Sequence, residues 1–272
     1  MSEVDALIRE EISRALQGGE PVLVATIIAA PGGGEHVGAK MLVRPDGTTI
    51  GTLGVGALDA AVREGAPEAF RRHRVHTRYL SPEGEETTRR EAASDSYQVM
   101  IEVHERPCSL VIAGGGHVGK ALSEIASLCG FRVTIVDDRP EYADPQRFPE
   151  ADRVIRGRFD EVLSEYPLDA TTYVVAVTRG HKHDEASLRS VIGRGAAYVG
   201  MIGSRRRAAA VLQHLVEEGL DADAVAQVRT PIGLDIGAES PEEIAVAVMA
   251  EIILVRRGGG TGAPLSGRKA GG

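Results

Sequence analysis

The sequence predicts an α/β protein in which a smaller α+β domain precedes a parallel sheet with helices on both faces. From Ser109 onwards, short apolar strands alternate with helical stretches, a rhythm typical of βαβ units. The expected strands cover residues 110–113, 133–137, 173–177 and 197–200. A glycine-rich turn directly follows the first of them and begins a helix at 118–128. This order indicates a C-terminal Rossmann-type domain.

The length of the chain, 272 residues, suits two domains. We expect an N-terminal α+β domain at 1–105 and the Rossmann-type domain at 106–257. The Gly-rich tail at 258–272 has little apolar surface to bury, so we expect it to be disordered.

The composition restricts the class of partner. Asp and Glu number 39 against 31 Lys and Arg, a formal net charge of -8 that argues against nucleic acid. No apolar run approaches the ~18 residues that cross a bilayer, and no signal peptide is recognisable, so we expect a cytoplasmic protein. The two cysteines, Cys108 and Cys129, form no metal-binding pattern, and we expect both to be packed, reduced thiols.

Periodicity and turn residues define the elements of the N-terminal domain. The expected elements are a helix at 2–16, a strand at 22–28, a hairpin of 40–44 and 48–52, a helix at 58–70 and a strand at 97–103. Charge dominates between Glu64 and Ser96, which predicts a mobile surface connection.

The best-marked helix is the last one. Ser240 is placed as N-cap, Pro241 as the first helical residue and Glu243 as the partner in a capping box, before an apolar run that reaches Val255. Gly258 is placed to end the helix.

The glycine turn has the spacing and the position of a phosphate-binding loop. In Gly114-x-Gly116-x-x-Gly119, the first glycine allows the turn, the second lets a phosphate approach backbone N–H groups, and the third lets helix pack on strand. A glycine turn without a ligand is the structural alternative. His117 either contacts the phosphate or only caps the helix backbone.

An acidic residue lies at the end of the second strand, about the expected distance after the turn. Asp137 can accept hydrogen bonds from a ribose diol, which favours NAD or an adenosine over a 2′-phosphate, whereas Arg139 can reverse that preference. The expected cofactor-binding residues are Gly114, Gly115, Gly116, His117, Val118, Gly119, Asp137, Asp138, Arg139, Thr178, Arg179, His181, Gly203 and Ser204.

The segment Thr178 to Asp184 follows another strand and therefore lies at the carboxyl edge of the sheet, where ligands of open α/β folds bind. His181 and His183 are two residues apart, so they do not share a helical face, and no third ligand can be assigned; we expect no protein-bound metal. We place Asp184 as the cap of the next helix, with Arg179 and His181 facing an anionic group.

A second strand-to-helix turn carries Gly203, with Ser204 as the N-cap, and three arginines at 205–207. Cations in a first helical turn oppose the helix dipole, so they indicate either a bound anion or simply a solvated face. In the N-terminal domain, the glycine-rich segment 31–40 suits either a close ligand approach or a long turn, and the turn is the simpler interpretation. The glycine-rich segment 51–59 precedes the helix expected at 58–70 and offers a possible second anion-binding N-terminus.

These segments together resemble the XdhC/CoxI family, the accessory proteins that mature xanthine dehydrogenase and related molybdenum hydroxylases. The resemblance spans nearly the whole chain. Its residues are 113–119, 136–141, 178–181, 199–204, Pro231 to Gly237 running into Ser240 to Ala245, and in the first domain 38–43, Asp46-Gly47 and 51–59.

The resemblance implies a homodimer that handles molybdenum cofactor (molybdopterin) and delivers it to a molybdenum hydroxylase apoenzyme. This chain departs from the family at Gly33-Gly34-Glu35-His36, where a Ser-Pro-Arg stretch is common, and at 54–59 and 94–96, where members carry cysteines. Residues 1–107 contain no cysteine, so no thiol of the first domain can carry sulfur.

We therefore expect an accessory factor that binds molybdenum cofactor or a nucleotide between its two domains. The alternatives are an NAD(P)-dependent oxidoreductase in which His181 or Asp235 moves protons, and a non-catalytic nucleotide-binding scaffold.

Overall fold

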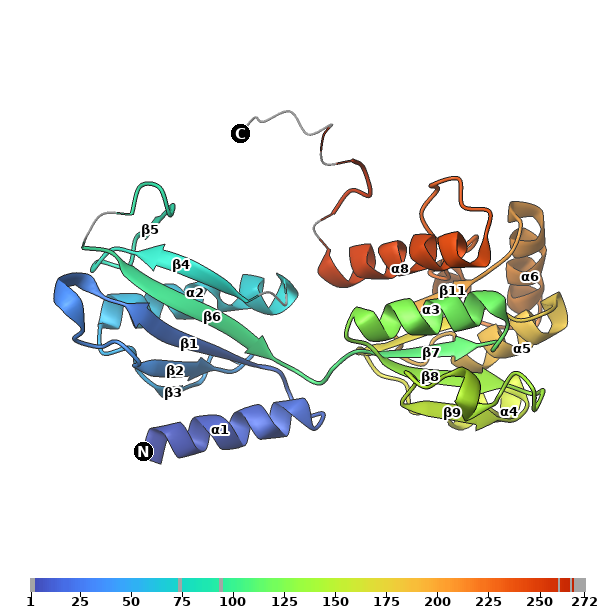
Figure 1. Ribbon diagram of the computed structural model, residues 1–272, viewed down its shortest axis with the longest axis horizontal. Helices are drawn as coiled ribbons and strands as arrows, with labels where there is room; N and C mark the ends of the chain where they lie inside the picture. The colour runs from blue at the N-terminus through green and yellow to red at the C-terminus, as the bar shows by residue number, and fades with distance from the viewer. Residues whose placement is uncertain (1–2, 73–74, 93–94, 259, 265, 267–272) are drawn as a thin grey trace. The chain divides into compact units, whose positions relative to one another are not determined.

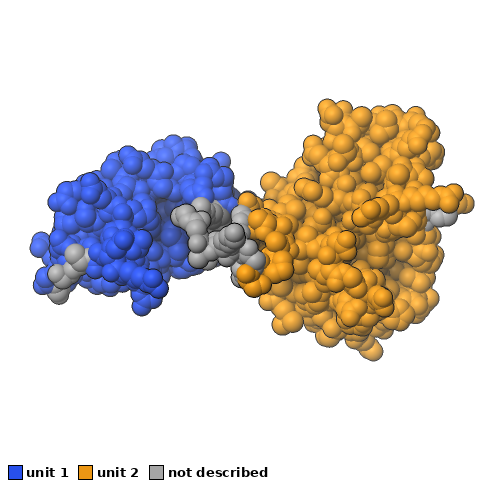
Figure 2. All heavy atoms as spheres, turned by 90° about the horizontal axis from the view of Figure 1, so that it is seen from above, with its two compact units in different colours: residues 1–106 blue, residues 107–272 orange. Residues whose placement is uncertain are grey.

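The computed structural model describes residues 3–72, 75–92, 95–258, 260–264 and 266, without the side chains of Arg72 and His181 (Figure 1). The chain divides into two compact units, Met1–Arg106 and Pro107–Gly272, coloured separately in Figure 2. The tail at 258–272 was expected to be disordered, and part of it, residues 259, 265 and 267–272, lies outside the described residues. No helix among the described residues is long and apolar enough to cross a bilayer.

The first unit is an antiparallel sheet with strand order β3-β2-β1-β6-β4-β5 and two helices. Its elements are α1 (Glu3–Leu16), β1 (Val22–Ala29), β2 (Lys40–Val43), β3 (Thr49–Gly51), α2 (Gly56–Arg72), β4 (His76–Leu80), β5 (Glu86–Thr87) and β6 (Tyr97–His104), with a 3-10 turn at Pro31–Gly33.

Strand β1 is apolar at nearly every position because helices cover both of its faces (Figure 1). Leu23 packs into the cluster that includes α2 residues, whereas Val22 and Val24 pack with Ile8 of α1. Alternate side chains of a strand point to opposite faces, so the uninterrupted run places one helix on each side of the sheet.

Much of the described part of the segment from Glu64 to Ser96 is regular structure rather than the connection that its charge predicts, so the prediction is wrong for the helix and the strands there. Helix α2 continues to Arg72, and β4 pairs antiparallel with β6. The charged strand is stabilised by its backbone pairing and by Arg78, which donates to the carbonyl of Ala61 at 2.7 Å and to Glu86 at 2.9 Å.

The second unit is a five-stranded parallel sheet with strand order β11-β10-β7-β8-β9, which confirms the expected fold class. Its strands are β7 (Ser109–Ala113), β8 (Arg132–Asp137), β9 (Arg153–Arg156), β10 (Thr172–Ala176) and β11 (Tyr198–Met201). Its helices are α3 (His117–Leu128), α4 (Phe159–Glu165), α5 (His181–Val191), α6 (Arg205–Glu217), α7 (Ala222–Ala226) and α8 (Pro241–Arg257), with a 3-10 turn at Pro145–Arg147.

The helices of this unit cover both faces of the sheet. Helices α3 and α8 lie side by side over one face (Figure 1), where Leu122 and Ile252 share a core with alternate residues of β7 and β8. Phe159 and Leu163 of α4 pack on the other face with Val111. Strand β9, an edge strand with an arginine at each end, has no apolar run and was not anticipated.

The last helix begins as its sequence predicts. The Ser240 hydroxyl accepts from the backbone N–H of Glu243, whose carboxylate accepts from the Ser240 N–H, and Gly258 ends the helix in the left-handed region at φ 62°.

The expected burial of both cysteines is wrong in part, because Cys108 is buried but Cys129 is exposed at the end of α3.

Candidate functional site at the carboxyl edge of the second sheet

The turn between β7 and α3 is built from glycines that the backbone requires. Gly114 adopts φ 120°, and a Cβ there would lie 2.5 Å from the carbonyl oxygen of Val177. A Cβ on Gly119 would lie 1.9 Å from the carbonyl oxygen of Gly114, so the helix can approach the turn only with glycine at this position. Both residues serve the fold.

Gly116 differs from these two glycines. It is the N-cap of α3 without any side-chain hydrogen bond, its φ is an ordinary -68°, and a Cβ there would meet nothing within 4 Å. The first N–H groups of a helix have no partners within the helix, and its dipole makes this end positive. The uncapped end of α3 therefore offers open space in front of N–H donors, with exposed His117 as its first helical residue.

The acidic residue at the end of β8 is committed to the fold. The Asp137 side chain is 1% exposed and accepts from the N–H of Gly115 at 2.8 Å and from the Arg139 N–H and Nε, both at 3.0 Å, and Nη2 at 3.1 Å. Burial opposes its ionisation, but these hydrogen bonds outweigh that effect and lower the pKa of the carboxyl group. The ribose contact expected of Asp137 would require these bonds to break.

Arg139 is fixed from two sides. The hydrogen bond to Asp137 raises the pKa of its guanidinium group, which also lies 3.6 Å from the centroid of the Tyr142 ring. Asp137, Arg139 and Tyr142 thus support the glycine turn from the β8 side.

Asp138 and Arg179 form a bidentate ion pair at the same edge. Nη1 and Nη2 of Arg179 donate to Oδ1 and Oδ2 of Asp138 at 2.9 and 3.0 Å. The two side chains are 25% and 42% exposed, so solvent and solutes can reach them.

Asp184 is not the helix cap that the sequence suggested. Helix α5 begins at His181 with Gly180 as N-cap, and Asp184 is fully buried within the first turns of the helix. Its carboxylate accepts from the N–H of Thr178 at 3.2 Å and the hydroxyl at 2.6 Å, and it pairs with Arg207. Burial raises the pKa of this carboxyl group.

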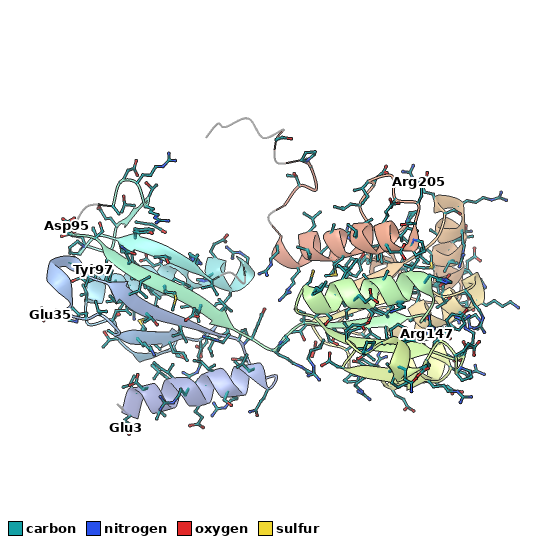
Figure 3. The ribbon with its side chains drawn as sticks, in the orientation of Figure 1. Glu3, Glu35, Asp95, Tyr97, Arg147 and Arg205 are labelled. Atoms are coloured by element: carbon teal, nitrogen blue, oxygen red, sulfur yellow. The ribbon has the colours of Figure 1, made fainter. Side chains whose placement is uncertain are left out.

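This pair explains one of the three arginines at the start of α6. Arg207 reaches inward to Asp184, whereas Arg205, labelled in Figure 3, and Arg206 are exposed. The hydroxyl of Ser204 accepts from the Arg207 N–H at 3.3 Å, which confirms Ser204 as the N-cap.

The described residues do not bring the two candidates for proton transfer, His181 and Asp235, together in one site. The side chain of His181 lies outside the described residues, and Asp235 is exposed in the loop that leads to α8. His183 is half-buried and lies edge-on to Phe159, with ring centroids 5.5 Å apart.

One cluster at metal-ligand distances was not anticipated. Ligand atoms of Glu185, His214 and Glu218 lie within 4.8 Å of one another. Arg189 bonds to both glutamates, so its one positive charge already offsets part of their negative charge.

A hollow of about 820 Å³ lies beside the beginning of β11, at the edge of the sheet opposite the glycine turn. The phenol of Tyr198 donates to Glu251 at 2.6 Å there, and the Gly233 N–H donates to the same carboxylate oxygen at 2.8 Å. Burial raises the pKa of the Tyr198 phenol. Tyr198 and Glu251 are 53 residues apart, and neither lies in a pattern that sequence analysis would select.

In the first unit, the glycine segment 51–59 is a braced turn. Asp59 of α2 accepts from the hydroxyl of Thr52 at 2.6 Å and from the Leu53 N–H at 2.8 Å. A Cβ on Gly54 would lie 2.4 Å from Nδ1 of His36, so this glycine is needed for close packing.

Comparison with known proteins assigns the family. Residues 110–252 match the XdhC Rossmann domain, and residues 15–79 match the XdhC and CoxI family. The chain belongs to the XdhC and CoxI family. The match to the Rossmann domain includes the glycine turn, the Asp138–Arg179 pair and the Asp184–Arg207 pair.

Three curated relatives are similar to parts of this chain. The uncharacterized protein YqeB of Escherichia coli is 30% identical over 239 residues, which cover 87% of this chain and 44% of YqeB. A probable subunit of xanthine dehydrogenase from Bacillus subtilis is 33% identical over 54% of this chain and 43% of its own length. The molybdenum cofactor insertion chaperone PaoD of Escherichia coli is 26% identical over 57% of this chain and 43% of its own length. The matched residues thus span less than half of each relative.

A crystal structure described as a xanthine dehydrogenase from Bacillus halodurans shares the fold. The TM-score is 0.54 at 20% identity, and the match covers 97% of this chain and 98% of that one. At this identity the likeness shows the fold alone.

Proposed function

We propose that this protein is an accessory factor in the maturation of a molybdenum hydroxylase, and that it binds a phosphate-bearing cofactor at the glycine turn of its second unit. The names of two relatives, a molybdenum cofactor insertion chaperone and a probable xanthine dehydrogenase subunit, support the maturation role. The cofactor is the cargo of such a factor, and its partner is the apoenzyme that receives it.

The observation that carries the binding proposal is the uncapped end of α3. Gly116 leaves open space in front of the first N–H groups of the helix, the arrangement that accepts phosphate in dinucleotide-binding domains. Residues 114–119 surround the phosphate in this proposal. Asp138, Arg139, Thr178 and Arg179 line its two sides, and Gly203 and Ser204 begin the next helix along the edge.

The test is Gly116→Val, titrated calorimetrically with NAD, NADP, AMP and a molybdopterin nucleotide. A valine fits the fold, because a Cβ meets nothing within 4 Å, but its side chain occupies the space in front of the N–H groups. We expect the loss of nucleotide binding and of the activation of a co-expressed hydroxylase. Gly56→Val is the matched control, since Gly56 also begins a helix and also has open space around its Cβ. Unchanged affinity in folded Gly116→Val would refute the site.

The intact glycine spacing also supports a second function, NAD(P)-dependent hydride transfer. That function requires a proton-transfer group at the carboxyl edge, for which His181 and Asp235 are the candidates. Reduction of NAD or NADP by purified protein with candidate hydroxy or amino substrates, abolished in His181→Ala or Asp235→Ala, would favour an enzyme over an accessory factor.

A further inference from the structure

The ion pair of Asp138 and Arg179 spans the end of the strand that carries the glycine turn. Strand β7 lies between β8 and β10 in the sheet, Asp138 follows β8, and Arg179 follows β10 by three residues. Gly114 is held from both sides, through its N–H to the Val136 carbonyl at 2.8 Å and through the close approach of Val177. A bond between Asp138 and Arg179 therefore crosses the carboxyl end of β7, next to the glycine turn.

The carboxylate of this pair is the one that a ligand can reach. Asp137, at the usual ribose-binding position, is 1% exposed and already accepts four hydrogen bonds. Asp138 is the next residue, is 25% exposed and has its two oxygens on a single guanidinium group. Ribose hydroxyls donate well to a carboxylate, so Asp138 can take over the role that Asp137 cannot perform.

Arg179 is the matching group for the phosphate. A guanidinium group binds phosphate oxygens in the same bidentate geometry as a carboxylate. In this structure Asp138 occupies that geometry. Exposed ion pairs contribute little to stability, and Arg179 is 42% exposed, so exchanging one oxyanion for another costs little.

We propose that the Asp138–Arg179 pair separates when a nucleotide binds, with Arg179 transferring to the phosphate and Asp138 to the ribose diol. The inference rests on the proposed binding site at the glycine turn and specifies its ligand class. The pair selects ligands that carry a phosphate group and a ribose with both hydroxyls free, and it discriminates against phosphates without that sugar.

The test uses ADP and 2′,3′-dideoxy-ADP, two probes that differ only in the diol. With the native protein we expect ADP to bind more tightly than the dideoxy form, on the order of tenfold, as for hydrogen bonds to a charged acceptor. Asp138→Asn should bring the ratio of the two affinities close to one. It should also tighten dideoxy-ADP binding, because Arg179 no longer has a competing carboxylate.

Two further variants distinguish a change in the affinity ratio of the two probes from a general loss of binding. Arg179→Gln should weaken both probes and leave their ratio unchanged. Asp160→Asn is the matched control, because Asp160 forms a bidentate pair with Arg158, at 3.1 and 2.7 Å, beside the edge strand β9. Both affinities should stay at native values there. Thermal unfolding of each variant checks that it is folded.

The outcomes distinguish this inference from the proposed function. If Gly116→Val abolishes binding but Asp138→Asn keeps the native ratio, the role of the pair is overturned and the glycine site stands. If Asp138→Asn weakens both probes equally, the pair is only structural and the inference is again overturned. If neither probe binds to any form, or Gly116→Val binds normally, the proposed site itself fails.

Discussion

Asp137→Asn is the sharpest test of how the glycine turn is held. The native carboxylate accepts from Gly115 and Arg139 while almost fully buried. An asparagine can keep the two contacts of Oδ1, but its amide group then faces the N–H of Gly115 and Nη2 of Arg139. The amide N–H groups of the asparagine would then face two other hydrogen-bond donors, where the native protein has the acceptor Oδ2 of Asp137.

The expected cost follows from these contacts. Removing one partner of a buried ion pair costs about 3–5 kcal/mol. Arg139 is 25% exposed, so water can solvate part of its charge, and the lower end applies. We expect a loss of about 3 kcal/mol, which lowers the melting temperature of a unit of this size by roughly 6–12 °C.

Differential scanning calorimetry of the full chain measures this loss, with Asp152→Asn as the control. Asp152 also accepts from an arginine, Arg132 at 3.3 Å, and from a backbone N–H, that of Val133 at 2.9 Å. Its side chain is 38% exposed, so the same substitution should cost less than about 1 kcal/mol.

The pH dependence of this stability difference is an independent test of the role of Asp137. The folded protein lowers the pKa of Asp137 below its ordinary value of 3.8, so its contribution is complete above that pH and is lost as the pH falls through the lowered pKa. The difference in stability between native protein and Asp137→Asn should therefore shrink in acid. Equal losses for the Asp137 and Asp152 variants, or a difference that grows as pH falls, would refute this account.

Three other predictions concern single contacts. Asp184→Ala removes the buried partner of Thr178 and Arg207 and should cost about 3 kcal/mol by urea unfolding, whereas Arg207→Met together with Asp184→Leu should recover part of that loss. Ser240→Ala breaks the capping box of α8 and should cost about 1 kcal/mol, seen as faster amide exchange in its first turn. Exposed Cys129 should react with a thiol reagent in the folded protein and buried Cys108 only on unfolding, so two equally fast thiols would contradict the packing.

The predictable parts of this protein are local in sequence. The glycine turn, the capping box of α8 and the Ser204 cap are each specified within six residues, so their geometry follows from residue type and order. The βαβ rhythm likewise limited the strand order of the second unit to a small set of solutions.

The parts that escaped prediction depend on partners distant in sequence. Asp137 is bonded by Gly115, 22 residues earlier, and Asp184 by Arg207, 23 residues later. Neither distance is visible in a linear pattern, and each carboxylate looked free to bind a ligand or cap a helix. Strand β4 was missed for a different reason, since backbone pairing with β6 stabilises it despite its charge.

The packing of α3 against α8 has a consequence for how the protein is made. The apolar side of α3 includes Leu122 and Ala126, and α8 covers it with Val248 and Ile252. More than a hundred residues separate the two helices, so a growing chain carries α3 with that side uncovered until translation has passed Arg257. The first unit is complete long before then. The core that α3 and α8 share in the second unit can therefore close only after the chain has been synthesised as far as α8.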